Sequence, residues 1–268
     1  MFPYIQLGGR PITWYMITAL AGVLAVIFFT YKMSVRQKLN EMHMLFMMLF
    51  AFGGVVLFSH ILYALTIPDL TFYVLTHLGD MKSFDDFLLG MGIIFGGSVF
   101  YGGLIGAIFV FFVYTKAKKL SFGDYSDIGA MSIPLFHFFG RIGCFLEGCC
   151  YGVEWEHGVV YNYSVVSSAN HVHRFPVQLV EAALNLMLFF LLLYLYKKGK
   201  ARHKILAVYL LVYPTYRFIL EFLRGDEYRG FVGPLSTSQF ISLILIAVTT
   251  VWLLTNYCKT HKGTDKNA

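Results

Sequence analysis

The chain has 268 residues, of which 57% are hydrophobic and 13% are charged, and its formal net charge is +6 at pH 7. Soluble domains have roughly 45–50% apolar and about 25% charged residues, so this composition excludes an ordinary soluble protein and indicates an integral membrane protein. The positive charge requires no nucleic-acid partner, because basic residues beside membrane helices set the topology and contact anionic lipid.

Seven apolar stretches are each long enough, at about 20 residues, to cross the hydrocarbon core of a bilayer as a helix. They are residues 13–31, 44–66, 88–114, 126–146, 176–196, 205–224 and 238–256. The segment before the first stretch lacks a basic n-region and no small-residue cleavage site follows, so we expect a permanent helix rather than a signal peptide. The sequence therefore predicts one all-α, polytopic membrane domain over residues 1–268.

Basic residues gather in alternate connections between these stretches. Fourteen of the 21 lysines and arginines lie there: Lys32, Arg36, Lys38, Lys116, Lys118, Lys119, Lys197, Lys198, Lys200, Arg202, Lys204, Lys259, Lys262 and Lys266. Cytoplasmic loops carry such an excess, which predicts an external N-terminus, a cytoplasmic C-terminus and an external loop at residues 147–175. This orientation requires an odd number of spans, in agreement with seven.

The third stretch is rich in glycine. Its glycines are Gly90, Gly92, Gly96, Gly97, Gly102, Gly103 and Gly106. Small residues let helix backbones approach closely in membranes, so these glycines predict tight packing against a neighbouring helix.

The fourth stretch ends in the run GRIGCFLEGCCYG at residues 140–152, which places Arg141, Glu147 and three cysteines near the external boundary. Ionisable groups are costly inside a bilayer and usually mark functional sites.

The three cysteines Cys144, Cys149 and Cys150 would face an oxidising compartment, where a disulfide is chemically permitted. We rank small packing residues or a disulfide first, and a nucleophile favoured by the nearby arginine second. A metal site ranks third, because the spacing is not a recognised one and only His137 lies nearby as a fourth ligand. Three further histidines in the external loop are expected to be solvated: His157, His171 and His173.

Polar residues also occur in the next two stretches, at the same expected depth. Gln178 and Glu181 occupy the first two turns of the fifth stretch. Along the sixth, polar residues recur at spacings of four, four and three: Tyr213, Arg217, Glu221 and Arg224. These spacings predict a single helical face. An alternative interpretation is a structural ion pair between Arg217 and Glu221 that keeps helices in register.

Six runs of the sequence then carry a resemblance. They are WY at 14–15, YGGLIG at 101–106, GRIG at 140–143, PVQLVE at 176–181, the polar face at 213–224 and LSTSQ at 235–239. In this order and spacing they resemble the prolipoprotein diacylglyceryl transferase family over nearly the whole chain. GRIG and the Tyr-x3-Arg-x3-Glu-x2-Arg pattern are the most specific of them.

The resemblance implies seven transmembrane helices, an external N-terminus and a bacterial cytoplasmic membrane location with the active site toward the outer face. It implies transfer of the diacylglyceryl group of phosphatidylglycerol to the lipobox cysteine thiol of a prolipoprotein, without metal or organic cofactor. Glycerol phosphate leaves in this reaction, and planar guanidinium groups stabilise such a leaving phosphate by bidentate contacts. The sequence carries no signal for an oligomeric state.

The resemblance also assigns roles to residues. It places the phosphate-binding arginines at Arg141 and Arg217, tyrosines at Tyr15 and Tyr213, a carboxylate at Glu221 and a required glycine at Gly152. We add Tyr101 and Glu147 as catalytic candidates, and five substrate-binding candidates: Gly102, Gly103, Gln178, Glu181 and Arg224.

Four positions depart from the family pattern. Tyr101 stands where the family usually has a histidine before two glycines, Cys144 replaces an asparagine, Cys149 replaces a glutamate and Phe175 replaces the histidine of an HPxQ motif. In the family, the histidine before the two glycines is a leading candidate for deprotonating the acceptor thiol. The tyrosine that replaces it here has a reference pKa near 10 and is a poor base. The candidates that remain are Glu147, Glu181, Glu221 and a Tyr101 of lowered pKa.

We therefore predict a diacylglyceryl transferase of the membrane. Two alternatives stay open on the sequence: a divergent paralogue that uses the same lipid donor with another acceptor, and a non-catalytic protein that binds or transports phospholipid.

Overall fold

The structure, a computed structural model, describes residues 4–7, 10–81, 83–226 and 230–264, so Lys266 lies outside the described residues. Seven helices in this part of the chain are long and apolar enough to cross a membrane. They are α1 (Trp14–Arg36), α2 (Glu41–Thr66), α5 (Phe100–Ala117), α6 (Phe122–Glu147), α7 (Val177–Lys197), α8 (Ile205–Leu220) with the 3₁₀ turn η3 (Glu221–Leu223), and α9 (Thr237–Thr264). The predicted all-α polytopic fold is confirmed.

The spanning helices satisfy their own backbone groups, which a bilayer core requires. Helices α1 and α2 are also capped by side chains at their N-termini, as Thr13 accepts from the Met16 N–H at 3.2 Å and Asn40 from the His43 N–H at 3.1 Å. Large apolar side chains such as Leu20, Leu24 and Phe28 of α1 point outward, as expected of a surface in contact with lipid.

The third predicted span, residues 88–114, is wrong in its first part. Residues 88–95 belong to a separate helix, α4 (Phe84–Phe95), and α5 begins only at Phe100. The break follows from close contact at Gly97, where an added Cβ would lie 2.2 Å from the Tyr63 ring and where the carbonyl oxygen contacts His60 Nδ1 at 2.7 Å. Two successive glycines also weaken a helix at this point.

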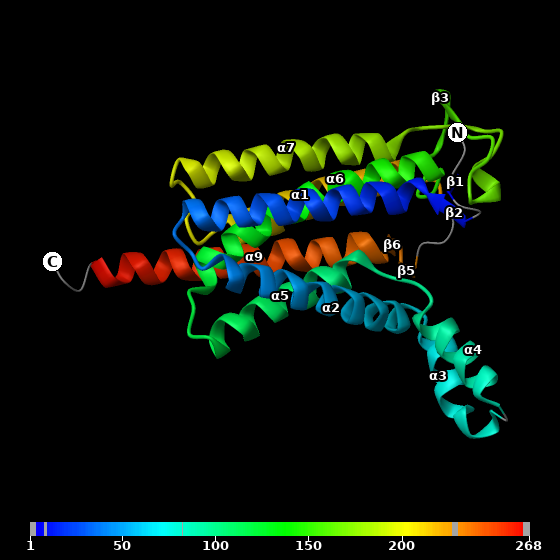
Figure 1. Ribbon diagram of the computed structural model, residues 1–268, viewed down its shortest axis with the longest axis horizontal. Helices are drawn as coiled ribbons and strands as arrows, with labels where there is room; N and C mark the ends of the chain where they lie inside the picture. The colour runs from blue at the N-terminus through cyan, green and yellow to red at the C-terminus, as the bar shows by residue number, and fades with distance from the viewer. Residues whose placement is uncertain (1–3, 8–9, 82, 227–229, 265–268) are drawn as a thin grey trace.

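Helix α4 pairs with α3 (Pro68–Thr76), and the 3₁₀ turn η1 (Leu78–Asp80) lies between them. This α3–α4 hairpin projects away from the bundle (Figure 1). Gly90, one of the glycines predicted to allow close packing, lies inside this hairpin. A Cβ there would lie 2.7 Å from Met81 Cε and 3.2 Å from Val74 Cγ1. The glycines of the predicted third span are therefore divided between two structural units.

Helices α2 and α5 meet along four glycines, here called the glycine seam: Gly54, Gly102, Gly103 and Gly106. A Cβ at Gly106 would lie 2.3 Å from the Gly54 carbonyl oxygen, and one at Gly102 would lie 2.4 Å from the Phe58 carbonyl oxygen. The backbones are in direct contact there, so the predicted close packing is confirmed for this half of the stretch.

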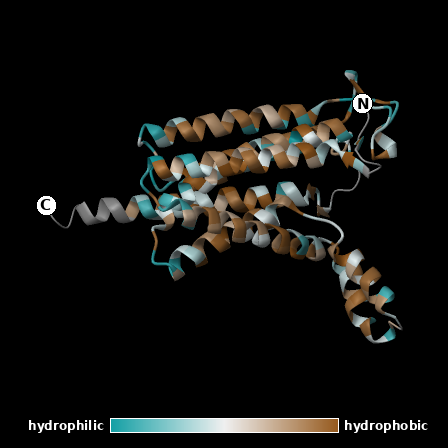
Figure 2. Ribbon diagram, in the orientation of Figure 1, coloured by the Kyte–Doolittle hydropathy of each residue, from teal (hydrophilic) through white to brown (hydrophobic). Residues whose placement is uncertain are grey.

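Short strands gather at one end of the bundle (Figure 1). They form three two-stranded antiparallel sheets: β1 (Tyr4–Leu7) with β2 (Arg10–Thr13), β3 (Glu154–Val160) with β4 (His173–Arg174), and β5 (Phe231–Val232) with β6 (Leu235–Ser236). A 3₁₀ turn, η2 (Ser167–Ala169), lies between β3 and β4. The lysine- and arginine-rich connections lie at the opposite end, and hydrophilic residues concentrate at the two ends of the bundle (Figure 2).

Candidate functional site

Four charged side chains from three helices meet inside the bundle near the end that carries the strands. They form what we call the arginine network: Arg141 of α6, Glu181 of α7, and Arg217 and Glu221 of α8 and η3. All four are at most 9% exposed. Buried charges are tolerated only when they are paired, and here two cations face two carboxylates.

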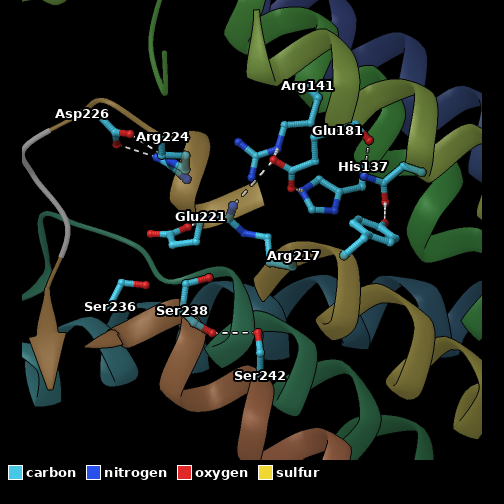
Figure 3. A network of polar contacts seen from close by, with 12 residues as sticks. His137, Arg141, Glu181, Arg217, Glu221, Arg224, Asp226, Ser236, Ser238 and Ser242 are labelled. Atoms are coloured by element: carbon cyan, nitrogen blue, oxygen red, sulfur yellow. Dashed lines mark hydrogen bonds and ion pairs between the residues drawn. The ribbon is translucent and has the colours of Figure 1, made fainter. Parts of the chain in front are cut away.

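Glu181 is the centre of the network. Its Oε2 atom lies 3.0 Å from Arg141 Nε and 3.9 Å from Arg217 Nη1, while Arg217 Nη2 lies 2.7 Å from Glu221 Oε2. Figure 3 shows the two arginine side chains approaching this carboxylate from different helices. The predicted ion pair between Arg217 of α8 and Glu221 of η3 therefore exists, and Glu181 and Arg141 extend it to α7 and α6.

Arg224 departs from the predicted helical face. Helix α8 ends at Leu220, η3 tightens the chain, and Arg224 itself is extended with φ −84° and ψ 138°. Its guanidinium turns to Asp226, with Nε 2.8 Å from Oδ1. The prediction that all four polar residues of this stretch share one face was wrong at Arg224, because the helix ends before that residue.

Tyrosines of α5 and α8 pack together beside the network, since Tyr213 lies one turn before Arg217 on α8. The Tyr101 and Tyr213 rings are 6.1 Å apart, and Tyr213 stacks on Tyr209 at 5.4 Å. The Tyr101 hydroxyl lies 2.6 Å from Ser242 Oγ, which donates to the Ser238 carbonyl, so Tyr101 is the donor in its own bond. Its proton therefore faces α9.

His137 belongs to the site, although the sequence suggested it only as a possible metal ligand. It lies one turn before Arg141 on α6, with Nε2 3.8 Å from Glu181 Oε1, and its ring stacks on Phe100 at a centroid distance of 4.5 Å. Its Nδ1 atom is buried and has no hydrogen-bond partner among the described residues. Its i, i+4 spacing to an arginine on a polar helix was the signal that could have identified it.

Two predicted site residues, Tyr15 and Glu147, contact each other at the edge of the site. The Tyr15 N–H donates to Glu147 Oε1 at 3.3 Å. The Tyr15 side chain is 42% exposed and packs beside Gly143, where an added Cβ would lie 2.9 Å from its Cδ2 atom. Glu147 is not among the described ion pairs of the arginine network.

The other predicted binding residues have mainly packing and positioning contacts. Gly102 and Gly103 belong to the glycine seam rather than to the polar interior. Gln178 is fully buried and donates from Nε2 to the Cys149 carbonyl at 2.8 Å. A Cβ at Gly152 would lie 2.3 Å from the Phe175 carbonyl oxygen, so this position admits only glycine.

The three cysteines after GRIG come together at the end of α6. Their sulfur atoms all lie within 4.8 Å of one another, Cys144 is buried and the other two are partly buried. All four cysteines of the chain are free thiols in this structure. His137 lies outside this group of donor atoms, so the fourth ligand that the sequence suggested is not part of it.

Comparison with known proteins gives a consistent result. The profile of the family described as prolipoprotein diacylglyceryl transferase matches residues 3–255. A phosphatidylglycerol–prolipoprotein diacylglyceryl transferase of Clostridium tetani is 33% identical over 245 residues, which cover 91% of this chain and 92% of that protein. A Clostridium perfringens protein named phosphatidylglycerol–prolipoprotein diacylglyceryl transferase 2 is 36% identical over 56% of this chain and 59% of its own length. The Streptococcus pneumoniae enzyme of that name is 28% identical over 91% of this chain and 89% of its own length.

Proposed function

We propose that this protein transfers the diacylglyceryl group of phosphatidylglycerol to a prolipoprotein, because the chain belongs to the prolipoprotein diacylglyceryl transferase family. It is a multi-pass protein of the cell membrane with seven helices of spanning length among its described residues. The finer part of the proposal is that the acceptor is the lipobox cysteine thiol and that the arginine network binds the donor phosphate.

The observation that carries the phosphate assignment is the meeting of Arg141 and Arg217 at one carboxylate from separate helices. A guanidinium has five N–H donors, and Arg141 approaches Glu181 through Nε. Its two terminal amino groups can therefore bind phosphate oxygens while Glu181 holds the side chain in place. Arg217 is held by Glu221 through Nη2 and brings a second guanidinium to the same carboxylate, so the two cations together suit a single phosphate.

The chemistry requires this charge. A carbon–sulfur bond forms at the glyceryl carbon of the donor while its bond to the phosphate oxygen breaks, and glycerol phosphate leaves with the electron pair. Fixed cations in a dry site stabilise the charge that develops on the leaving oxygens, an effect typically worth several kcal/mol per donor. A lysine would carry the charge without the planar fork.

The candidate bases for the acceptor thiol are all engaged in other contacts. Glu181 and Glu221 contact arginines, Glu147 accepts from a backbone N–H, and the Tyr101 hydroxyl donates to Ser242. These contacts give each group a positioning role. We propose that Tyr101 and Tyr213 shape the wall of the donor site.

A direct assay tests the function. Purified protein in phosphatidylglycerol micelles is incubated with a peptide that contains a lipobox cysteine, and the mass gain of a diacylglyceryl group on that cysteine is measured. We expect the gain with the cysteine peptide and none with its serine counterpart. Lipid binding without any mass gain would favour the non-catalytic alternative, and gain only on a different thiol or hydroxyl would favour the paralogue.

The side of the membrane is a separate proposal. We propose that the end with the strands faces outward, supported by the basic connections at the other end. An impermeant thiol reagent added to intact cells should label cysteines introduced at residues 157–173 and spare those at 198–203. The reverse pattern would place the site on the cytoplasmic face, where exported acceptors are not found.

A further inference from the structure

The cysteine cluster at the end of α6 has a geometry that packing does not require. Gly148 ends the helix in the left-handed conformation with φ +75°, and Cys150 is also left-handed with φ +55°. A non-glycine residue in this region is uncommon and indicates strain that the surroundings must support. These two turns bring Cys149 and Cys150 back toward Cys144.

Neighbouring contacts hold the returning segment in place. The Cys149 N–H donates to the Cys144 carbonyl at 3.1 Å, and the Cys149 carbonyl accepts from Gln178 of α7 at 2.8 Å. The Gly148 carbonyl accepts from Ser164 Oγ at 3.0 Å. The cluster is therefore fixed from three sides before any ligand binds.

The spacing of the three sulfur atoms suits one metal ion. Zinc binds thiolate sulfur at about 2.3 Å in tetrahedral geometry, which separates the ligand sulfurs by about 3.8 Å. The three sulfur atoms here lie within 4.8 Å of one another, which is close to the separation that a single ion requires. A disulfide would use two of the three and leave the third without a function.

Charge around the cluster favours thiolates. Arg141 and Arg224 lie close enough to Cys150 for their positive charge to act on its thiol. Metal binds the thiolate form of cysteine, and a neighbouring positive charge favours that form.

We propose that Cys144, Cys149 and Cys150 form a site for a thiophilic divalent cation of the zinc type, with its fourth position open to the acceptor thiol. The second half of this proposal rests on the proposed function. Catalytic zinc sites keep such an open position beside three protein ligands, whereas structural sites close it with a fourth. Among the described residues the cluster offers three donor atoms.

The site would take the place of a general base. The acceptor thiol displaces a water from the fourth position and binds as thiolate, and its proton passes to solvent. The thiolate sulfur then attacks the glyceryl carbon, the new carbon–sulfur bond forms, and the carbon–oxygen bond breaks with its electron pair on the leaving phosphate. The cation keeps its charge throughout, and Arg141, which contacts Glu181 in the arginine network, also places positive charge on Cys150.

Metal binding is tested without activity. Reduced, chelator-treated full-length protein in detergent is titrated with Co²⁺, which reports thiolate ligands by a near-ultraviolet charge-transfer band and tetrahedral geometry by visible bands. We expect saturation at one equivalent and displacement by Zn²⁺. Each of Cys144→Ser, Cys149→Ser and Cys150→Ser should weaken binding by about 10–100-fold or more. Cys258→Ser is the matched control, because that thiol is exposed on α9, and it should bind as the wild type does.

Two results would overturn the site. One is the absence of a thiolate band in the folded wild-type protein, which needs no variant to interpret. The other is a disulfide between two of these cysteines in protein isolated under air, detected as a mass lower by two hydrogens and mapped to the two residues.

The transfer assay separates this proposal from the function itself. Removal of the metal should lower transfer on the order of 100-fold or more, and Zn²⁺ should restore it. Equal activity of stripped and loaded protein would overturn the thiol-binding role and leave the transferase function intact. A loaded protein that binds Co²⁺ through the cysteines but modifies no peptide would overturn the transferase function and leave the metal site intact.

Discussion

The glycine seam and the arginine network join helices of the same bundle by opposite means. In the seam, a Cβ on Gly106 would lie 2.3 Å from the facing carbonyl, so contact depends on the absence of side chains. In the network, long charged side chains bridge α6, α7 and α8 through Glu181. The seam costs no desolvation, whereas each buried ion costs several kcal/mol before pairing repays it.

The difference predicts that the seam is structural and that the network is functional. Small residues are sufficient to pack membrane helices, so a bundle needs no buried ions for its stability. Charges that are kept at such cost are expected to act on a substrate. Substitutions in the network should therefore affect transfer first, and substitutions in the seam should affect folding first.

The largest effect is expected at the two arginines. Arg217→Ala or Arg141→Ala should lower transfer on the order of 10³-fold, because each removes charge stabilisation of the leaving phosphate. The lysine variants should recover little of the loss, since they lack bidentate geometry. Arg202→Ala serves as the control, because its side chain is 69% exposed in a connection at the other end. Full activity of Arg217→Ala in the micelle assay would contradict the phosphate assignment.

The next largest effect is expected at the centre of the network. Glu181→Gln keeps the shape but leaves two buried guanidinium groups short of one negative charge, which should cost about 3 kcal/mol of unfolding free energy. A bound phosphate supplies negative charge, so phosphatidylglycerol should reduce the loss of thermal midpoint relative to neutral detergent. Glu154→Gln, whose side chain is 74% exposed, should change neither value. An equal loss of thermal midpoint with and without phosphatidylglycerol would show that the network binds no anionic lipid.

Gly54 of the glycine seam and its neighbour Gly53, which lies outside the seam, provide a matched test. A Cβ at Gly54 would meet Val110 at 2.7 Å, whereas one at Gly53 would have no atom within 4 Å. Gly54→Leu should lower the unfolding free energy by about 1–3 kcal/mol through overpacking, and Gly53→Leu should leave it near the wild-type value. Thermal unfolding in detergent measures both. Similar midpoints for the two variants would contradict close packing between α2 and α5.

The smallest effect is expected at Tyr101. Tyr101→Phe removes one hydrogen bond to Ser242, worth about 0.5–1.5 kcal/mol, so transfer should fall less than about tenfold with an unchanged pH profile. If the phenol were the base, the rate would fall much further and its rise with pH would flatten. The pH–rate profiles of the two proteins distinguish these outcomes.

Much of the fold could be predicted from local sequence properties. Runs of about 20 apolar residues identify spans, and the i, i+4 spacing of Arg217 and Glu221 identifies their ion pair, because both depend on neighbours in the chain. The alternating basic connections lie at one end of the structure, as the orientation argument required. The family resemblance, carried by short runs in a fixed order, agrees with the profile match over residues 3–255.

Tertiary structure alone decided the rest. Apolar length could not distinguish one long span from α4 followed by α5, because the break at Gly97 depends on its contact with Tyr63 of another helix. Sequence spacing could not show that the three cysteines meet, because two left-handed residues bring their sulfur atoms together. Glu181 was one polar residue among several, and its central place follows from where α6, α7 and α8 cross. Hydropathy and periodicity describe one helix at a time, whereas a site is made where several helices meet.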